Sequence, residues 1–311
     1  MATQKTKEIS REMRAAVVER ILGLMERDGL KWSQGFDGPS LRAVNVLTPT
    51  KYRGVNRLWL AARTMDRGLK DNRWATYGQA QAAGWQVRKG AKGEHVECWK
   101  KIPFTLNPDG SRHWLSKKEL AGADPNEVGW ALCIASTATV FNYSEIEGAP
   151  ELAPDPGPKG FELADQLVAS SRCPVIEAAV DACCYDPIED KIFMAPRGVF
   201  DTPGEWTAVL IHEMAHSTGV PLKRDVINFF GTPDYAMEEL RAELASVFVS
   251  ADLSVPIAVA HLESHAAYLQ SWIKACREDS DAMISAIQDA QSIADYIIDR
   301  LQLADRVQPA A

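Results

Sequence analysis

The chain has 311 residues, of which 46% are hydrophobic and 24% are charged, and its formal net charge is −8. This composition is typical of a globular protein and excludes the disordered and fibrous classes. No apolar run approaches the roughly 18–20 residues that span a bilayer, which excludes an integral membrane protein. The N-terminus has charge but no apolar core, so we expect no secretory signal.

The charge is distributed unevenly along the chain. Residues 1–150 carry a net charge of +7 and seven of the nine tryptophans, whereas residues 151–311 carry a net charge of −15. This asymmetry predicts two domains with different partners. Four prolines over residues 150–158 favour an extended connector between them. The expected division is a first domain over 1–147, a linker over 148–160 and a second domain over 161–311.

Helical and strand patterns both occur in the first half. Apolar residues at three- and four-residue spacing predict a helix over 7–25 that ends near Gly29. Alternation over 95–99 and an apolar, β-branched run over 130–141 predict strands. We therefore expect an α+β first domain.

The second half is mainly helical in pattern. Residues 161–171 predict a helix and residues 191–195 a short strand. From Thr202 onwards the pattern is almost wholly helical, and it ends in an apolar stripe over 268–301 that we interpret as core packing. The predicted fold class is α+β, with two domains of which the second is mainly helical.

The strongest motif is His-Glu-Met-Ala-His over residues 212–216. On a helix, imidazoles at i and i+4 share one face and converge on one point, with Glu213 beside them. Residues 202–205 form a capping box with proline at the first helical position, and Gly219 provides a stop signal. The spacing predicts a zinc site in the last turns of this helix.

Zinc needs a third protein ligand, with its fourth position left to water. Glu239 and Glu243 share one face of another predicted helix, so one can bind the metal while the other orients a histidine. Their spacing is similar to that on the third-ligand helix of many zincins, which favours Glu239 as ligand and Glu243 as its support. The reverse assignment stays open, and Glu238 is expected to point into solvent. The predicted zinc ligands are His212, His216 and Glu239.

This set of groups predicts metal-assisted hydrolysis of a peptide bond. Zinc lowers the pKa of a bound water and polarises the scissile carbonyl. Glu213 is the expected catalytic base, which takes the water proton and passes it to the leaving amine. The strand over 191–195 is placed to hold an extended peptide by backbone pairing.

A basic, aromatic stretch lies between residues 51 and 100, with 11 Lys or Arg against 4 acids. Single strands of nucleic acid are bound by cationic grooves whose aromatic faces stack on bases. The alternative is a solvated basic face with its tryptophans in the core. Since the acidic half repels DNA, we expect the footprint within the first 147 residues. The candidate nucleic-acid-binding residues are Lys51, Tyr52, Arg53, Trp74, Arg88, Lys89 and Lys92.

The sequence resembles the ArdC-type antirestriction proteins of conjugative plasmids, whose N-terminal half also resembles a region of some plasmid primases. The matching stretches are residues 51–56, 74–80, 87–90, 140–142, 210–219, 235–243 and 268–272.

The resemblance implies a domain that binds single-stranded DNA, followed by a zincin-like metallopeptidase domain. It also implies a role in shielding incoming plasmid DNA from restriction, with a protein substrate such as a component of the host restriction system. The competing hypothesis is a non-enzymatic protein that coats single-stranded DNA and has a structural or latent zinc site.

The chain has six sparsely placed cysteines. This spacing predicts reduced thiols and a protein of the cytoplasm.

Overall fold

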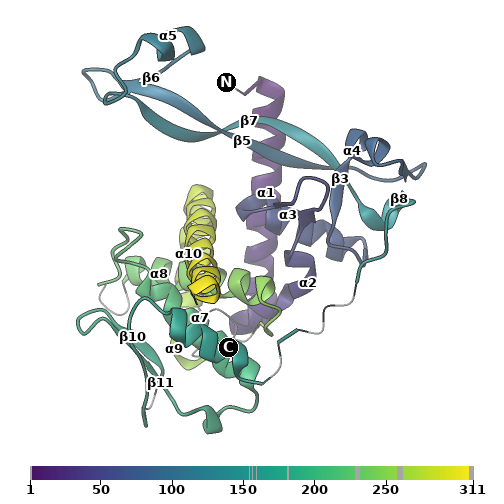
Figure 1. Ribbon diagram of the computed structural model, residues 1–311. Coiled ribbons are helices and arrows are strands. Elements are labelled where there is room, and N and C mark those ends of the chain that lie inside the picture. Colours follow the sequence, from purple (N-terminus) through teal and green to yellow (C-terminus); the bar gives the residue numbers. More distant parts are fainter. Residues whose placement is uncertain are drawn as a thin grey trace.

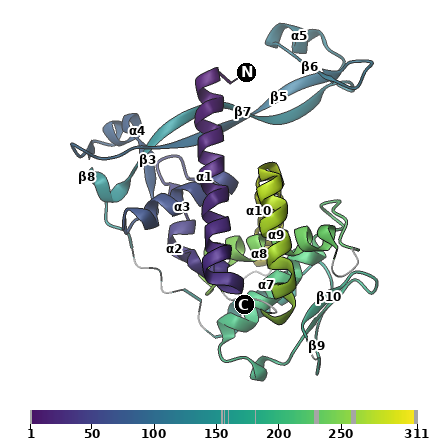
Figure 2. The same ribbon diagram turned by 180° about the vertical axis from the view of Figure 1, so that it is seen from behind.

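The computed structural model describes residues 2–307 except residues 154, 156, 159, 181, 228–231 and 258–261. A twisted ribbon of strands crosses one end of the molecule, and most of the helices gather at the other end (Figure 1). Helix α1 (Gln4–Asp28) is seen along its whole length from behind (Figure 2). Among the described helices, none combines the length and the apolar character that a membrane crossing needs.

Helix α1 confirms the helix predicted over 7–25 and begins three residues earlier. The earlier start has a local cause, because the Thr3 side chain accepts a hydrogen bond from the Thr6 amide and caps the first turn. The helix ends at Asp28 and is capped by Gly29, whose φ of 59° suits a residue without a side chain. Its buried face is formed by Met13, Val17, Val18, Ile21, Leu22, Leu24 and Met25.

The main sheet of the first half has four strands in the order β3-β7-β5-β6. Its centre is the antiparallel pair of β5 (Glu94–Leu106) and β7 (Gly129–Asn142), which confirms and extends the two predicted strands. Strand β3 (Trp74–Thr76) pairs with one end of β7, and β6 (Arg112–Trp114) pairs with the opposite end of β5. The β5–β7 ribbon therefore projects beyond the body of the protein, with α5 (Lys117–Gly122) at its far end (Figure 1).

Helix α3 (Gly54–Asp66) lies under this sheet and contacts both α1 and β5. Short elements complete the first half, namely η1 (Gly29–Gly35), α2 (Gly38–Leu41), β1 (Val44–Asn45), β2 (Thr50–Lys51), α4 (Tyr77–Ala82), β4 (Gln86–Val87), η2 (Tyr143–Glu145) and β8 (Ile146–Glu147).

The second half has a small sheet beside a helical bundle. Its three strands follow the order β10-β11-β9, with β11 parallel to β9 and antiparallel to β10. The predicted helix over 161–171 and the predicted strand over 191–195 are confirmed as α6 and β11. The elements are α6 (Glu162–Ser170), β9 (Val175–Glu177), β10 (Cys184–Asp186), β11 (Lys191–Met194), η3 (Arg197–Val199), α7 (Pro203–Ser217), α8 (Pro233–Asp252), α9 (Leu262–Glu278) and α10 (Ser280–Val307).

One hydrophobic core joins the two halves. It contains the apolar face of α1, residues of α3 such as Leu58, and the buried residues of α7 and α8. The apolar stripe predicted near the C-terminus lies in the same core, where Ile287, Ile293 and Ile297 of α10 are fully buried. The α+β class is confirmed, while the separation into 1–147, 148–160 and 161–311 stays a prediction.

Candidate functional site

Helix α7 brings two imidazoles together in the protein interior. It begins at the predicted capping box, in which Thr202 accepts from the amide of Glu205 and the Glu205 carboxylate accepts from the amide of Thr202. One turn apart on its buried face, His212 and His216 place their Nε2 atoms 3.1 Å from each other. His212 is 1% exposed.

Helix α8 packs against α7 and supplies a carboxylate to the same point. Oxygens of Glu239 lie 3.6 Å from Nε2 of His212 and 3.6 Å from Nε2 of His216. One ligand atom from each of these three residues lies within 4.8 Å of the others. The three side chains named by sequence reasoning thus converge in space.

Glu243 lies one turn further along α8 and faces the other side of the first imidazole. Its Oε2 is 3.5 Å from Nδ1 of His212. A carboxylate beside Nδ1 fixes the orientation of the ring and favours an available lone pair on Nε2. The structure therefore places Glu239 and Glu243 on opposite nitrogens of the same ring.

The expectation for Glu238 is wrong. Its side chain is buried, and its two oxygens accept hydrogen bonds of 2.6 and 2.5 Å from Nη1 of Arg224. Its Oε1 also lies 3.4 Å from Nδ1 of His216. Arg224 follows α7 in the sequence and additionally donates to the carbonyl of Ala215, so it ties the end of that helix to α8.

The carboxylates control the protonation of the two imidazoles. Burial lowers the pKa of His212, but the adjacent carboxylates of Glu239 and Glu243 outweigh it, and the pKa lies well above its ordinary value. Burial also lowers the pKa of His216, and the negative charge of Glu239 and the hydrogen bond with Glu238 reverse that effect and raise it. The site therefore attracts positive charge, either as protons or as a metal cation.

Glu213 lies on the side of α7 that faces the small sheet. The carboxylate is buried, and its Oε2 accepts a 2.8 Å hydrogen bond from the backbone amide of Tyr185 in β10. This bond fixes the direction of the carboxylate. It also shows that the outer edge of β10, rather than β11, adjoins the predicted catalytic group.

The side chains fit a divalent metal ion. Two ligands of a tetrahedral zinc ion, each about 2.0–2.1 Å from the metal, lie roughly 3.3 Å apart. The two Nε2 atoms are 3.1 Å apart, and each lies 3.6 Å from a different oxygen of Glu239. Two neutral imidazoles and one carboxylate are also a recognised zinc donor set. These residues can therefore hold the metal with little rearrangement.

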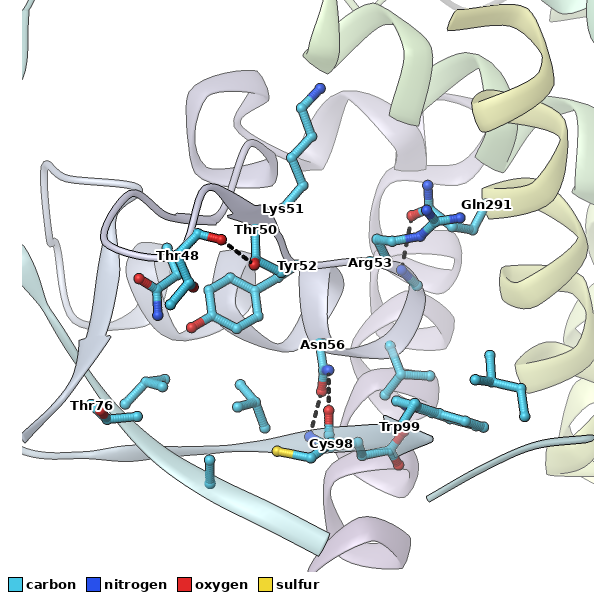
Figure 3. Close-up of a pocket in the computed structure, with 18 of the residues that line it drawn as sticks. Thr48, Thr50, Lys51, Tyr52, Arg53, Asn56, Thr76, Cys98, Trp99 and Gln291 are labelled. Atoms are coloured by element: carbon cyan, nitrogen blue, oxygen red, sulfur yellow. Dashed lines mark hydrogen bonds between the residues drawn. The ribbon is translucent and has the colours of Figure 1, made fainter. Parts of the chain in front are cut away.

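A second site lies in the first half, where a cavity of about 700 Å³ opens between α3 and the main sheet. Lys51, Tyr52 and Arg53 line it, and Figure 3 shows the Tyr52 ring directed into it. Burial raises the pKa of Tyr52 to about 12, against the opposing effect of its hydrogen bond with Asn45, so its hydroxyl stays protonated.

Other predicted nucleic-acid residues are dispersed. Arg88, Lys89 and Lys92 are exposed on the turn between β4 and β5 and do not line the cavity. Trp74 is fully buried in a small core cluster with residues such as Leu60, so its ring offers no face to a base. The prediction for Trp74 is therefore wrong.

Sequence reasoning missed the partners of these groups. Lys51 lies 3.6 Å from Asp252, and Arg53 is paired with Asp295, so both cations meet carboxylates of the second half. A pattern over a few neighbouring residues cannot predict contacts between positions so far apart in the chain. Such a pattern also does not predict that Arg224 binds Glu238 beside the histidines. The only sign of that contact in the sequence is the arginine itself, which lies between the zinc motif and α8.

Two family models match the chain and together cover most of it. One is described as the N-terminal domain of anti-restriction factor ArdC and matches residues 11–141. The other is described as a zincin-like metallopeptidase and matches residues 162–289, which include all of α7 and α8.

Relatives of different lengths match both halves at once. The protein y4eC of Sinorhizobium fredii is 32% identical over 304 residues, covering 96% of this chain and 95% of its own. A DNA primase TraC of Escherichia coli is 34% identical over 301 residues, which is 94% of this chain. The chain spans only 27% of that primase and 19% of a second TraC primase.

Two solved structures match the fold of this chain over both of its halves. The metal-free structure of the antirestriction protein ArdC from plasmid R388 has 27% sequence identity and a TM-score of 0.68, with 93% of this chain and 98% of that chain covered. The Mn(II)-bound structure of the same protein has 26% identity and a TM-score of 0.67, with 93% and 97% covered.

Proposed function

Because the chain belongs to the family of ArdC-type antirestriction proteins, we propose that it protects incoming plasmid DNA from restriction in the cytoplasm of the recipient cell. In this proposal the first half binds single-stranded DNA. The second half, which has a zincin-like fold, hydrolyses a protein substrate such as a component of the host restriction system.

The observation that carries the peptidase proposal is the convergence of His212, His216 and Glu239 within 4.8 Å. We assign these three as the metal ligands and Glu243 as the group that orients His212, because Glu239 faces both Nε2 atoms whereas Glu243 faces Nδ1. Zinc is the metal that this donor set favours. When bound, zinc supplies a Lewis acid that polarises a peptide carbonyl and lowers the pKa of water.

Glu213 is assigned as the group that takes a proton and returns it to the leaving amine. Its hydrogen bond from the amide of Tyr185 holds the carboxylate in place. An extended substrate needs a free strand edge for backbone pairing. Strand β11 is central in its sheet, which corrects the expectation for residues 191–195, and β10 is the edge strand on the side of Glu213.

DNA binding is assigned to the cations and aromatic groups of the first half. Lys51, Tyr52 and Arg53 surround the large cavity, and Arg88, Lys89 and Lys92 add exposed positive charge nearby in sequence. Cationic and aromatic groups at one surface are the combination that binds single strands with little sequence preference.

The test is the Glu213→Gln variant, which removes the base with almost no change in shape. Hydrolysis of a protein substrate should fall by about 10²- to 10⁴-fold, since this is the usual contribution of a general base. Antirestriction should be lost in conjugation assays. Bound metal, measured by elemental analysis, and affinity for single-stranded DNA should stay at wild-type values.

The matched control is Glu189→Gln, which neutralises an exposed carboxylate of the same half. It should behave as wild type in every assay. If Glu213→Gln retains metal, DNA binding and full antirestriction, peptide hydrolysis is not the mechanism. The protein would then act by coating DNA, with a structural or latent metal site.

A further inference from the structure

The large cavity is built by both halves of the chain. Its walls include the β1–β2 segment, α3 and the main sheet, and α10 closes one side with Gln288, Gln291 and Ser292. Gln291 is fixed there, because its Oε1 accepts a 2.9 Å hydrogen bond from the amide of Gly54 (Figure 3). A volume of about 700 Å³ lies within the range of cavities that hold small organic ligands.

One wall of the cavity is formed by β5, which contributes the four consecutive residues from Val96 to Trp99. Its pairing with β7 is irregular at this place. Cys98 is opposite Ser136 and Trp99 is opposite Ile134, so β7 carries one extra residue, Ala135, and such a bulge bends the ladder. Tyr52 and Trp99 both offer aromatic surface to the cavity (Figure 3).

Polar groups also line the cavity, among them Asn45, Thr76 and Gln79. Asn45 donates to Oε1 of Gln79 over 2.9 Å, and Thr76 donates to the same oxygen from its amide and from its hydroxyl. In this arrangement the Gln79 carbonyl is the acceptor of all three bonds, which orients its amide group as a hydrogen-bond donor. The cavity thus combines flat apolar surface with a fixed polar edge, as a planar heterocycle requires.

Two cations stand at the rim. The side chains of Lys51 and Arg53 are 62% and 60% exposed, and each is paired with a carboxylate of the second half. The Asp295 side chain is 31% exposed, and ion pairs at the surface contribute little and exchange readily, whereas Asp252 is 11% exposed and also holds the buried Arg57. A phosphate group can therefore replace Asp295 as the partner of Arg53.

We propose that this cavity receives one unstacked nucleotide of a single-stranded DNA, with the base against Tyr52 and its phosphate at Arg53. The inference rests on the proposed binding of single-stranded DNA and adds the place where a base is held. Because Gln291 of α10 forms part of the wall, the DNA site extends beyond the first 147 residues.

The test combines a change in the protein with a change in the DNA. Affinities of the full chain are measured by fluorescence anisotropy for a 20-nucleotide oligothymidine and for an abasic strand of equal length and charge. Tyr52→Leu keeps apolar volume but removes the aromatic face. We expect it to weaken binding of oligothymidine by about 5- to 100-fold, as loss of one stacked base does, and to leave binding of the abasic strand unchanged.

Tyr52→Phe keeps the ring and should restore the preference for bases that Tyr52→Leu loses. Tyr77→Ala removes an exposed tyrosine of α4 that does not line the cavity, and it should not change the preference for bases. Circular dichroism of each variant checks that the fold is retained.

Two results overturn the inference and leave the proposed function standing. One is equal affinity of the wild type for the oligothymidine and the abasic strand. The other is an unchanged preference for bases in folded Tyr52→Leu. If the wild type binds neither strand, the proposed DNA-binding function itself fails.

Discussion

Four carboxylates surround two imidazoles in the candidate metal centre. Glu239 faces both rings, Glu243 and Glu238 each face one Nδ1, and Glu213 adds negative charge from α7. So much negative charge in a buried place is costly unless positive charge accompanies it. A metal ion or protonated imidazoles can meet that requirement, and the two compete for the same nitrogens.

The raised pKa of His212 makes the stability of the metal-free protein depend on pH. In the folded chain His212 keeps its proton at pH values at which the same histidine of the unfolded chain, with an ordinary pKa of about 6.5, has lost it. The stabilisation is complete below about pH 6.5 and is lost as the pH rises through the folded-state pKa. We expect the Tm of chelator-treated protein to fall as the pH is raised from about 6 to 9.

Thermal unfolding in the presence of a chelator measures this effect. Added zinc should restore the Tm at the alkaline end, because the ion replaces the lost positive charge. A variant with His212→Ala and His216→Ala should show a weaker pH dependence. A metal-free wild type whose Tm does not fall with rising pH, relative to this variant, would contradict the expectation.

At the scale of elements, the proposed centre gives α8 two different tasks one helical turn apart. Glu239 and Glu243 lie on the same face, and the position of α7 decides which of them meets the Nε2 atoms. Arg224 and Glu238 hold the end of α7 against α8 and so maintain this alignment. The distinction between ligand and supporting carboxylate is therefore a matter of helix packing.

Substitution of the two acids should separate these tasks. Glu239→Ala should abolish stoichiometric metal binding, whereas Glu243→Gln should retain metal with an affinity lowered by about 10- to 100-fold. Elemental analysis gives the stoichiometry, and competition with a chromogenic chelator gives the affinity. Asp234→Asn, at an exposed acid of the same helix, is the control. Loss of metal in the Glu243 variant with retention in Glu239→Ala would reverse the assignment.

Local signals predicted the elements well, because caps and periodicity act within a few residues. The start of α7 follows from its capping box, and the apolar stripe of α10 follows from helical spacing. Contacts between distant segments were not predictable in this way. The burial of Trp74 depends on which strand pairs with β3, and the partner of Arg57 lies 195 positions away. Amino-acid composition cannot distinguish a buried tryptophan or cation from an exposed one.

At the scale of the molecule, the two halves share a core and a buried ion pair. Arg57 of α3 is 2% exposed, and it donates to the carbonyl of Leu41, to the carbonyl of Phe248 and to the carboxylate of Asp252. The guanidinium also stacks on the Phe248 ring at 4.7 Å. Neither half can therefore separate without exposing apolar surface and a buried charge.

We expect the full chain to unfold in one cooperative transition. Arg57→Ala should lower the free energy of unfolding by about 3–5 kcal/mol, since it breaks a buried ion pair and leaves the Asp252 carboxylate with the exposed Lys51, 3.6 Å away, in place of a buried guanidinium. Arg20→Ala, which removes an exposed pair with Asp66, should cost less than about 1 kcal/mol. Differential scanning calorimetry and urea titration measure these values. Two resolved transitions in the wild type would show that the halves unfold independently.

The position of Arg57 also bears on how such a protein is inherited. A recombination event that joined this first half to an unrelated second half would leave the Arg57 guanidinium buried without hydrogen-bond acceptors. The joined protein would fold stably only if the new second half placed a backbone carbonyl and a carboxylate where Phe248 and Asp252 now lie. Both halves occur together along y4eC and within the much longer TraC primases, as expected of two segments that are inherited together.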